Sequence, residues 1–406
     1  MEDKKIRLTF MNYVALCAAC MVSGAPGLAG PAIATCIEAF PDVPTATIRM
    51  LSTLPNLISM FVGLGLGTVV GKKIPYRTVS ITGALLVLIG GIGPFFFHSN
   101  WGIVLMFRAI LGLGVATGTY KAALIMRSVP ADRKAQIIGY GQSATNLMMV
   151  IIQPITGMLA DIKFYYAFLV YIVIAFIFVI ELFFLKEPPK EEMTADTETK
   201  ESDKTPAVTQ GKRRIAFWIF PLAVISFLNI TCLYAFNTGI SSYVVDKNIG
   251  TAVAAGTALS VYTFAGMLGN VFLKQFTKIF GRFSIAVTDA CIMLGLILLV
   301  MANGMPVIFA AAVLCGFGYI VGSTSLQYAA GRVAYPATLV LSTSIITCAS
   351  GGGSFLSSYY IGLAHSIVGA QTEVQSAYIL SIFVFAALAV FGVICSKKLY
   401  GTDKEE

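Results

Sequence analysis

The sequence predicts an all-α integral membrane protein with twelve transmembrane helices in two pseudo-symmetric six-helix bundles. Three observations support this fold class. The 406 residues are 57% hydrophobic and only 12% charged, whereas a soluble domain is roughly 25% charged. Apolar segments of membrane-spanning length recur along the whole chain, and one long polar segment divides them into two sets of six.

Each apolar segment is bounded by charged residues, Pro or Gly, and is long enough to cross a bilayer as a helix of ~20 residues. The first six are predicted at residues 10–36, 48–70, 78–97, 101–125, 137–160 and 164–185. The other six are predicted at 215–245, 252–273, 283–302, 306–329, 337–363 and 376–396. Several contain Pro or Gly, which membrane helices tolerate where neighbouring groups satisfy the freed backbone.

The polar segment 186–214 sets the predicted domain organisation. It carries seven acidic and seven basic residues with three prolines, a composition that cannot form a packed core. We therefore predict an N-terminal bundle over 1–185, a flexible cytoplasmic linker over 186–214, and a C-terminal bundle with a short cytoplasmic tail over 215–406.

The distribution of Lys and Arg predicts the orientation. With a cytoplasmic N-terminus, 23 of the 28 basic residues fall on the cytoplasmic side and three fall outside. The positive-inside rule therefore places both termini in the cytoplasm. The net charge of +8 reflects this topology. We expect a multi-pass protein of the plasma membrane, and we expect it to be a monomer. Its environment is the lipid bilayer, and no nucleic-acid partner is expected.

A glycine motif occurs once in each set of helices. The pattern GxGxxxG is repeated at an offset of 204 residues, at Gly112, Gly114 and Gly118 and at Gly316, Gly318 and Gly322. Together with the central polar segment, the repeat indicates a duplicated six-helix unit. Glycines four residues apart let two helix backbones approach closely, which suits helices that rock against each other.

The same region carries a family resemblance. The run Val104-x-x-x-Arg108-x-x-x-Gly112-x-Gly114 is similar to the fourth-helix signature of the major facilitator superfamily. The basic loop after the second segment departs from the family pattern, with Gly71 in place of an acidic residue. The resemblance implies two six-helix repeats that transport a solute, and it implies a role for Arg108 in coupling or conformational change.

Arg108 is the strongest candidate functional residue. It lies seven residues inside its helix, ~10 Å from the end, too deep to reach water from a lipid-facing position. We expect it to face the interior of the bundle, where its planar guanidinium can bind a carboxylate bidentately or hold helix carbonyls. The alternative is a purely structural, buried hydrogen-bonding role.

Two buried acids are candidates for coupling, because ionisable groups inside a membrane are costly and mark functional positions. Asp289 lies six residues inside the ninth segment and is a candidate proton carrier. The alternative for Asp289 is an ion pair with Lys278 or Arg282. Glu181 lies near the cytoplasmic end of the sixth segment, where interface anchoring or a salt bridge is the alternative.

Uncharged polar residues form stripes at helical spacing. With Arg108 they make up the predicted substrate site: Gln142, Asn146 and Gln153 in the fifth segment, Tyr234 and Asn237 in the seventh, and Ser323, Gln327 and Tyr328 in the tenth. Such residues also join neighbouring membrane helices by hydrogen bonds, which is the alternative for each stripe.

The sequence contains no motif of an enzyme, a cofactor site or a metal site. It predicts a secondary active transporter of a small organic solute, driven by a proton gradient or a solute gradient, with a site near the middle of the membrane. The uncharged stripes and one buried Arg favour a neutral or anionic substrate. A drug/proton antiporter-type exporter is one alternative, and a membrane sensor or scaffold without transport is another.

Overall fold

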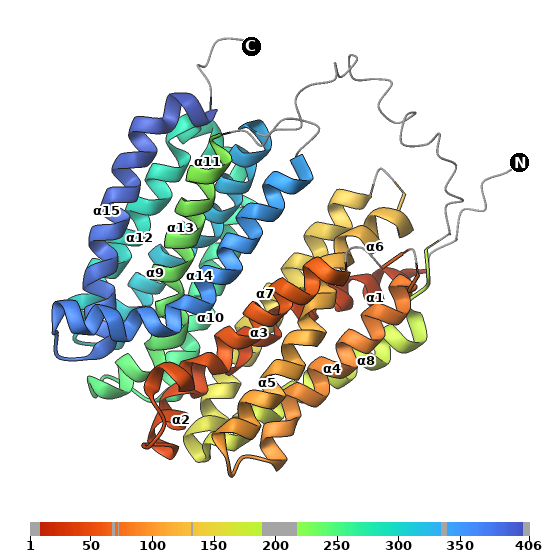
Figure 1. Ribbon diagram of the computed structural model, residues 1–406, viewed down its shortest axis with the longest axis horizontal. Helices are drawn as coiled ribbons and strands as arrows, with labels where there is room; N and C mark the ends of the chain where they lie inside the picture. The colour runs from red at the N-terminus through yellow and green to blue at the C-terminus, as the bar shows by residue number, and fades with distance from the viewer. Residues whose placement is uncertain are drawn as a thin grey trace, which may run out of the picture.

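A computed structural model of the protein describes residues 9–66, 70–71, 73–130, 133–188, 217–333 and 339–400. The helices of the first half and those of the second half form two bundles that lie side by side (Figure 1). The bundles approach each other at one end and diverge towards the end where α1 begins and α15 ends (Figure 1).

The N-terminal bundle consists of six long helical segments, several of them broken into shorter elements. In chain order they are α1 (Phe10–Met21), η1 (Val22–Ala32) and α2 (Ile33–Ala39); α3 (Thr45–Leu66); α4 (Tyr76–Phe96); α5 (Trp101–Val115), η2 (Ala116–Tyr120) and α6 (Lys121–Ser128); α7 (Lys134–Ile162); and η3 (Phe164–Tyr171) with α8 (Ile172–Phe184).

The C-terminal bundle has longer continuous helices. They are α9 (Ile219–Asp246), α10 (Ala252–Val271), α11 (Leu273–Phe280), η4 (Gly281–Phe283) with α12 (Ser284–Val300), α13 (Met305–Val333), α14 (Leu339–Val368) and α15 (Glu373–Tyr400). The sequence predicts a loop where α11 forms. This short helix ends at Gly281, whose φ of +46° is a conformation that favours glycine.

The twelve predicted spans are confirmed only in part. Among the described residues, 10 helical segments are long and apolar enough to cross a membrane. The segments containing α3 and α14 are also long helices, but they are not among those ten. The two helices pack against each other, and polar side chains meet there, as in the hydrogen bond between Thr53 and Ser358.

Each bundle has its own apolar core. One cluster of buried residues, from Ile219 to Cys395, belongs entirely to the C-terminal bundle. The main cluster of the N-terminal bundle extends from Ala18 to Ile177 and also includes Ala252 at the start of α10. Most of the predicted linker 186–214 lies outside the described residues, so its placement stays a prediction.

Glycine and proline interrupt the first segment near its middle. The eleven residues of η1 form a 3₁₀ helix that contains Pro26 and Pro31, whereas runs of more than about four such residues are uncommon. Both prolines lack the N–H that an α-helix would use. The break places backbone carbonyls of η1 within reach of side chains from other helices, including Tyr171 and Ser241.

The two GxGxxxG motifs make equivalent contacts, as expected for a duplicated unit. A Cβ added to Gly112 would meet Pro55 of α3 at 2.9 Å, and one added to Gly316 would meet the Tyr262 carbonyl of α10 at 2.0 Å. The Gly112 contact lies within the N-terminal bundle and the Gly316 contact within the C-terminal bundle. The motifs therefore bring helices into close approach inside each bundle, and whether these helices rock against each other stays a prediction.

Candidate functional site

Polar side chains join the two bundles along α3 and α14. At the end where the bundles approach each other, Arg49 Nη1 lies 3.0 Å from Glu373 Oε2 at the start of α15. Arg49 is 2% exposed, and Thr45 Oγ1 also donates to this carboxylate at 3.0 Å. One helical turn deeper, Thr53 Oγ1 and Ser358 Oγ share a hydrogen bond of 2.7 Å.

A second pair of helices, α7 and α10, closes the same end of the molecule. The carboxylate of Asp161 accepts the backbone N–H of Ala252 at 3.0 Å, at the start of α10. Acidic groups are favourable at a helix N-terminus because the helix dipole is positive there. Deeper in the pair, Gly256 packs against the Gln153 backbone and Ser260 Oγ donates to the Val150 carbonyl at 2.7 Å.

Both interfaces reach the middle of the helices. On α3 this interface includes Asn56, whose Nδ2 donates to Tyr234 Oη at 3.0 Å and to Ser354 Oγ at 3.2 Å. Each of these residues lies near the middle of its helix, eleven to fifteen residues from the start. At 1.5 Å per residue this is ~16–22 Å, about half the length of each helix. The three residues therefore lie near the middle of a membrane core ~30 Å thick.

Asn56, Tyr234 and Ser354 form what we call the midplane cluster. Its residues come from both bundles, and all are uncharged hydrogen-bonding groups. Towards the end where α1 begins and α15 ends, the helices of the two bundles separate (Figure 1). The bundles are therefore closed against each other on one side of the midplane cluster and apart on the other.

Arg108 lies in the interior of the N-terminal bundle, as the sequence predicts, and is 0% exposed. Its Nη1 donates to Tyr171 Oη at 2.7 Å, and that hydroxyl donates to the Ala25 carbonyl of η1 at 2.9 Å. The guanidinium also lies 5.0 Å from the ring centre of Phe168, within cation–π range. No carboxylate of the described residues pairs with it, and its Nε and second terminal nitrogen have no hydrogen-bond partner there.

Asp289 is buried in the C-terminal bundle, with 1% of its side chain exposed. Asn229 of α9 donates to its Oδ1 at 2.9 Å, whereas Oδ2 has no partner among the described residues. Neither Lys278 nor Arg282 pairs with it, and the Arg282 guanidinium packs on Phe283 instead. The ion-pair alternative for Asp289 therefore has no counterpart in the structure.

Glu181 is also fully buried, so it is not an exposed interface anchor. Ser80 of α4 donates to its Oε2 at 2.7 Å. Lys121 of α6 is the basic group whose charge acts on this carboxylate, and its Nζ donates to the Ala19 carbonyl of α1. Glu181, Ser80 and Lys121 thus form a polar cluster inside the N-terminal bundle, whereas Asp289 lies in the C-terminal bundle.

The predicted stripe on α7 changes in burial along the helix. Gln142 is exposed, Asn146 is half-buried and Gln153 is fully buried. Both amide atoms of Gln153 lack a partner among the described residues, although its backbone contacts α10. Burial thus increases towards the end at which the two bundles meet.

The remaining predicted residues lie on two helices of the C-terminal bundle. Tyr234 belongs to the midplane cluster, and Asn237 of α9 approaches Gly30 of η1 through its backbone carbonyl. Ser323 of α13 is half-buried and donates to a carbonyl of its own helix. The backbones of Gln327 and Tyr328 belong to α13, but their side chains lie outside what the structure describes.

Sequence reasoning missed Arg49, Asn56, Ser354 and Glu373 as residues that join the bundles. In the sequence, Arg49 is only one of the three basic residues predicted to lie on the outer side of the membrane. A signal was present, because residues 49, 53 and 56 are spaced by four and three and so share one face of a helix. Their partners lie about 300 residues away, so the sequence pattern alone does not reveal them.

Comparison with solved structures gives several close matches in fold. One is the nucleoside transporter NupG, with a TM-score of 0.73 at 12% identity, covering 94% of this chain and 99% of that one. A POT family transporter in complex with 5-aminolevulinic acid gives 0.74 at 14% identity and 96% of each chain.

A bacterial homologue of the lysosomal transporter Spinster, in an inward-facing and unoccupied conformation, gives a TM-score of 0.66 at 14% identity, covering 98% of this chain and 99% of that one. At such low identities these matches establish the fold. Comparison with curated proteins gives no match.

The family itself is established by sequence. The family model of the Major Facilitator Superfamily matches residues 15–358, which is most of the chain. This range includes the Arg108 motif and extends into α14, so it contains both glycine motifs and the midplane cluster. The protein is accordingly a multi-pass membrane transporter, not an enzyme, and it belongs to the major facilitator superfamily.

Proposed function

We propose that the protein is a secondary active transporter that moves a small organic solute, neutral or anionic, across the plasma membrane by alternating access. The observation that carries this proposal is the one-sided closure of the two bundles around the midplane cluster. With both termini in the cytoplasm, the open side faces inward. Opening the Arg49 side while closing the other would expose the same residues to the outside.

The midplane cluster suits a solute with hydrogen-bonding groups. It offers an amide, a phenol and a hydroxyl, each of which can exchange its present partner for a ligand. Arg108, two of whose nitrogens have no hydrogen-bond partner among the described residues, supplies a fixed positive charge in the same bundle as Asn56. These features support a neutral or anionic substrate over a cationic drug.

A proton is the proposed coupling ion, and Asp289 is its proposed carrier. Its carboxylate is held by one neutral amide and by no basic group among the described residues, so it can exist with or without a proton. Glu181 has Lys121 as a compensating charge and is the second candidate.

The test is transport by the purified protein in proteoliposomes. Neutral and anionic metabolites are first screened for thermal stabilisation, and hits are assayed for counterflow and for uptake driven by a pH gradient. Asn56→Ala should lower the affinity for the solute, measured from the solute dependence of the melting temperature, about tenfold, as expected for a lost hydrogen bond. Thr82→Ala, on an exposed face of α4, is the matched control and should behave as wild type.

Each negative result has a distinct meaning. Stabilisation by cationic drugs alone, with proton-coupled efflux, would replace this proposal with a drug/proton antiporter. Solute binding without counterflow or uptake would favour a sensor or scaffold. Equal solute binding by wild type and Asn56→Ala would remove the midplane cluster from the site.

A further inference from the structure

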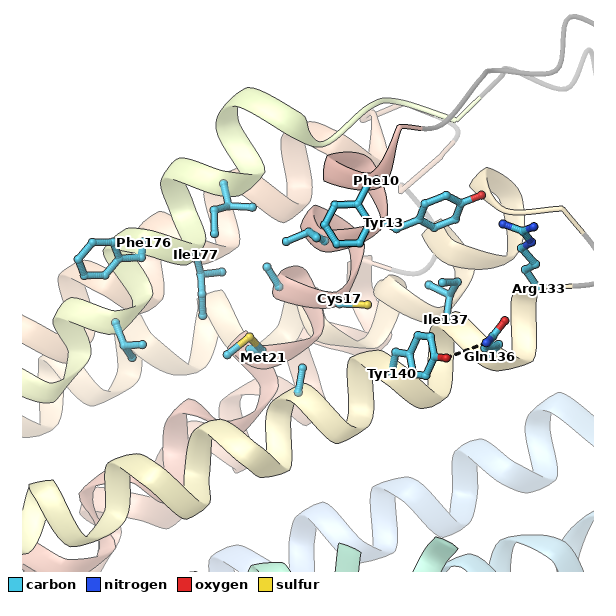
Figure 2. Close-up of a pocket in the computed structure, with 15 residues that line it drawn as sticks. Phe10, Tyr13, Cys17, Met21, Arg133, Gln136, Ile137, Tyr140, Phe176 and Ile177 are labelled. Atoms are coloured by element: carbon cyan, nitrogen blue, oxygen red, sulfur yellow. Dashed lines mark hydrogen bonds between the residues drawn. The ribbon is translucent and has the colours of Figure 1, made fainter.

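A groove lies on the outer surface of the N-terminal bundle, between α1, α7 and α8 (Figure 2). Its volume is about 620 Å³, comparable with ligand sites of roughly 300–1,000 Å³. One face of α1 supplies Phe10, Tyr13, Val14, Cys17, Ala18 and Met21. Because these residues recur every three or four positions, the groove runs along the helix.

The length of the groove matches one leaflet of a membrane. Phe10 and Met21 are eleven residues apart, which corresponds to ~16 Å of helix. The hydrocarbon core of a bilayer is ~30 Å thick, so one leaflet contributes ~15 Å. The groove therefore extends from one membrane surface to about the midplane.

The two ends of the groove differ chemically. Arg133, Gln136 and Tyr140 lie together at the end where α1 begins (Figure 2). Gln136 Nε2 donates to Tyr140 Oη at 2.7 Å, and Arg133 is exposed. The opposite end is lined by Met21, Phe176 and other apolar residues. The polar end lies on the side that the positive-inside rule assigns to the cytoplasm.

Two other apolar grooves on the described helices lack this polarity. One lies mainly between α10 and α13, and its lining residues include no charged side chain. The other lies between α12 and α15 and is lined entirely by apolar residues. Acyl chains can cover all three, but only a groove with a basic residue at its membrane-surface end complements a negatively charged headgroup.

We propose that the groove between α1, α7 and α8 binds one anionic phospholipid of the cytoplasmic leaflet. An acyl chain lies along α1, and the phosphate binds at Arg133, Gln136 and Tyr140. Arg133 supplies charge, while the amide and phenol supply hydrogen bonds. Tyr and Arg at this depth are the residue types that favour the headgroup region. This inference does not depend on the identity of the transported solute.

Native mass spectrometry of the full chain, released from micelles with equal phosphatidylglycerol and phosphatidylcholine, tests the headgroup site. We expect a one-lipid adduct that favours phosphatidylglycerol about fivefold, the effect of about 1 kcal/mol per basic residue near an anionic surface. Arg133→Gln should abolish the preference. Lys278→Gln, which removes an equally exposed charge from α11, should keep it.

A second pair of variants tests the acyl site. Ala144→Trp places a large side chain in the groove and should remove the adduct with either headgroup. Ala389→Trp, in the apolar groove between α12 and α15, is the control and should retain it. Should Ala144→Trp fail to fold, the result for Arg133→Gln decides by itself.

Two results would overturn the proposal. One is an unchanged headgroup preference in Arg133→Gln, which would make the adduct ordinary bilayer lipid. The other is a protein dimer that Ala144→Trp dissociates, which would assign the groove to a second copy of the chain.

Discussion

Individual buried polar residues in this protein are satisfied to very different degrees. Asn56 makes two hydrogen bonds across the bundles, whereas Arg108 and Asp289 each keep polar atoms without a partner among the described residues. A buried polar group without a partner is costly. We therefore expect these two residues to gain partners at another stage of transport.

Arg108 allows a test that separates ligand binding from structural support. Arg108→Ala should abolish transport and the stabilisation by an anionic solute, while Arg108→Lys should impair both because it loses the planar fork. Tyr171→Phe breaks the link from Arg108 to the Ala25 carbonyl but leaves the charge. It should lower the melting temperature yet retain solute stabilisation.

Thermal scanning with and without solute, together with counterflow, measures both properties. If Arg108→Ala and Tyr171→Phe lose stability equally and both still bind and transport the solute, Arg108 has only a structural role. The preference for an anionic substrate would then have no support from this residue.

Asp289 and Glu181 predict different effects on coupling. Asp289→Asn should retain solute exchange but lose accumulation driven by a pH gradient, because the neutral amide cannot carry a proton. Glu181→Gln should lower stability, since the charge of Lys121 would lose its nearby carboxylate, and should keep accumulation. Counterflow and pH-driven uptake in the same vesicles distinguish the two. Accumulation by Asp289→Asn equal to wild type would exclude it as the carrier.

At the scale of whole elements, the two bundles are joined by two pairs of helices that carry polar side chains at their contact. The ten apolar helical segments include those that form the grooved outer faces. In contrast, α3 and α14 carry polar side chains that meet each other across the bundles. Because α7 and α10 also meet across the bundles and are among the ten, mean hydropathy does not distinguish helices that face the other bundle from those that face only lipid.

Helix packing through the glycine motifs predicts a strong positional effect. Gly316→Ala would place a methyl group 2.0 Å from the Tyr262 carbonyl, and the two helices must separate to accommodate it. We expect a loss of about 1–3 kcal/mol, as for other overpacked positions, seen as a lower melting temperature in one detergent. Gly362→Ala, with no atom within 4 Å of the added Cβ, is the control. Equal melting temperatures for the two variants would contradict the close approach.

At the scale of the whole molecule, closure between the bundles is confined to one side. Two antiparallel helix pairs, α3 with α14 and α7 with α10, form this closure with polar contacts and glycines. Such an interface can open without exposing a large apolar surface. The Arg49–Glu373 contact is an ion pair of 3.0 Å at the end of this closure, made by a buried Arg49.

Breaking this ion pair should shift the protein towards the opposite conformation. Glu373→Gln leaves Arg49 buried without its carboxylate, a change that is strongly destabilising when charges are buried. A cysteine at Thr53, which is fully buried in the closure, should then react with thiol reagents added outside at least tenfold faster. The same proteins with Thr53 retained give the labelling of the native cysteines, which is subtracted.

The charge-reversed pair Arg49→Glu with Glu373→Arg should restore slow labelling. Unchanged labelling in Glu373→Gln would show that the contact does not hold the outer side closed.

The sequence determines the helices, the internal repeat and the burial of Arg108. These follow from local properties, because hydropathy and helical spacing depend on residues within a few turns of one another. The fold class and the family could therefore be predicted. The boundaries agree within a few residues for most helices, while the extra helix α11 and the 3₁₀ form of η1 could not be derived from hydropathy.

Only the tertiary structure decides which polar faces meet. Arg49 and Glu373 are 324 residues apart in the chain, and Asn56 is 178 residues from Tyr234. Such contacts depend on how each helix is rotated and on which helix packs beside it, and apolar periodicity constrains neither between two bundles. The predicted stripes therefore include Tyr234 but miss Asn56 and Ser354, whose roles exist only because two distant helices are packed together.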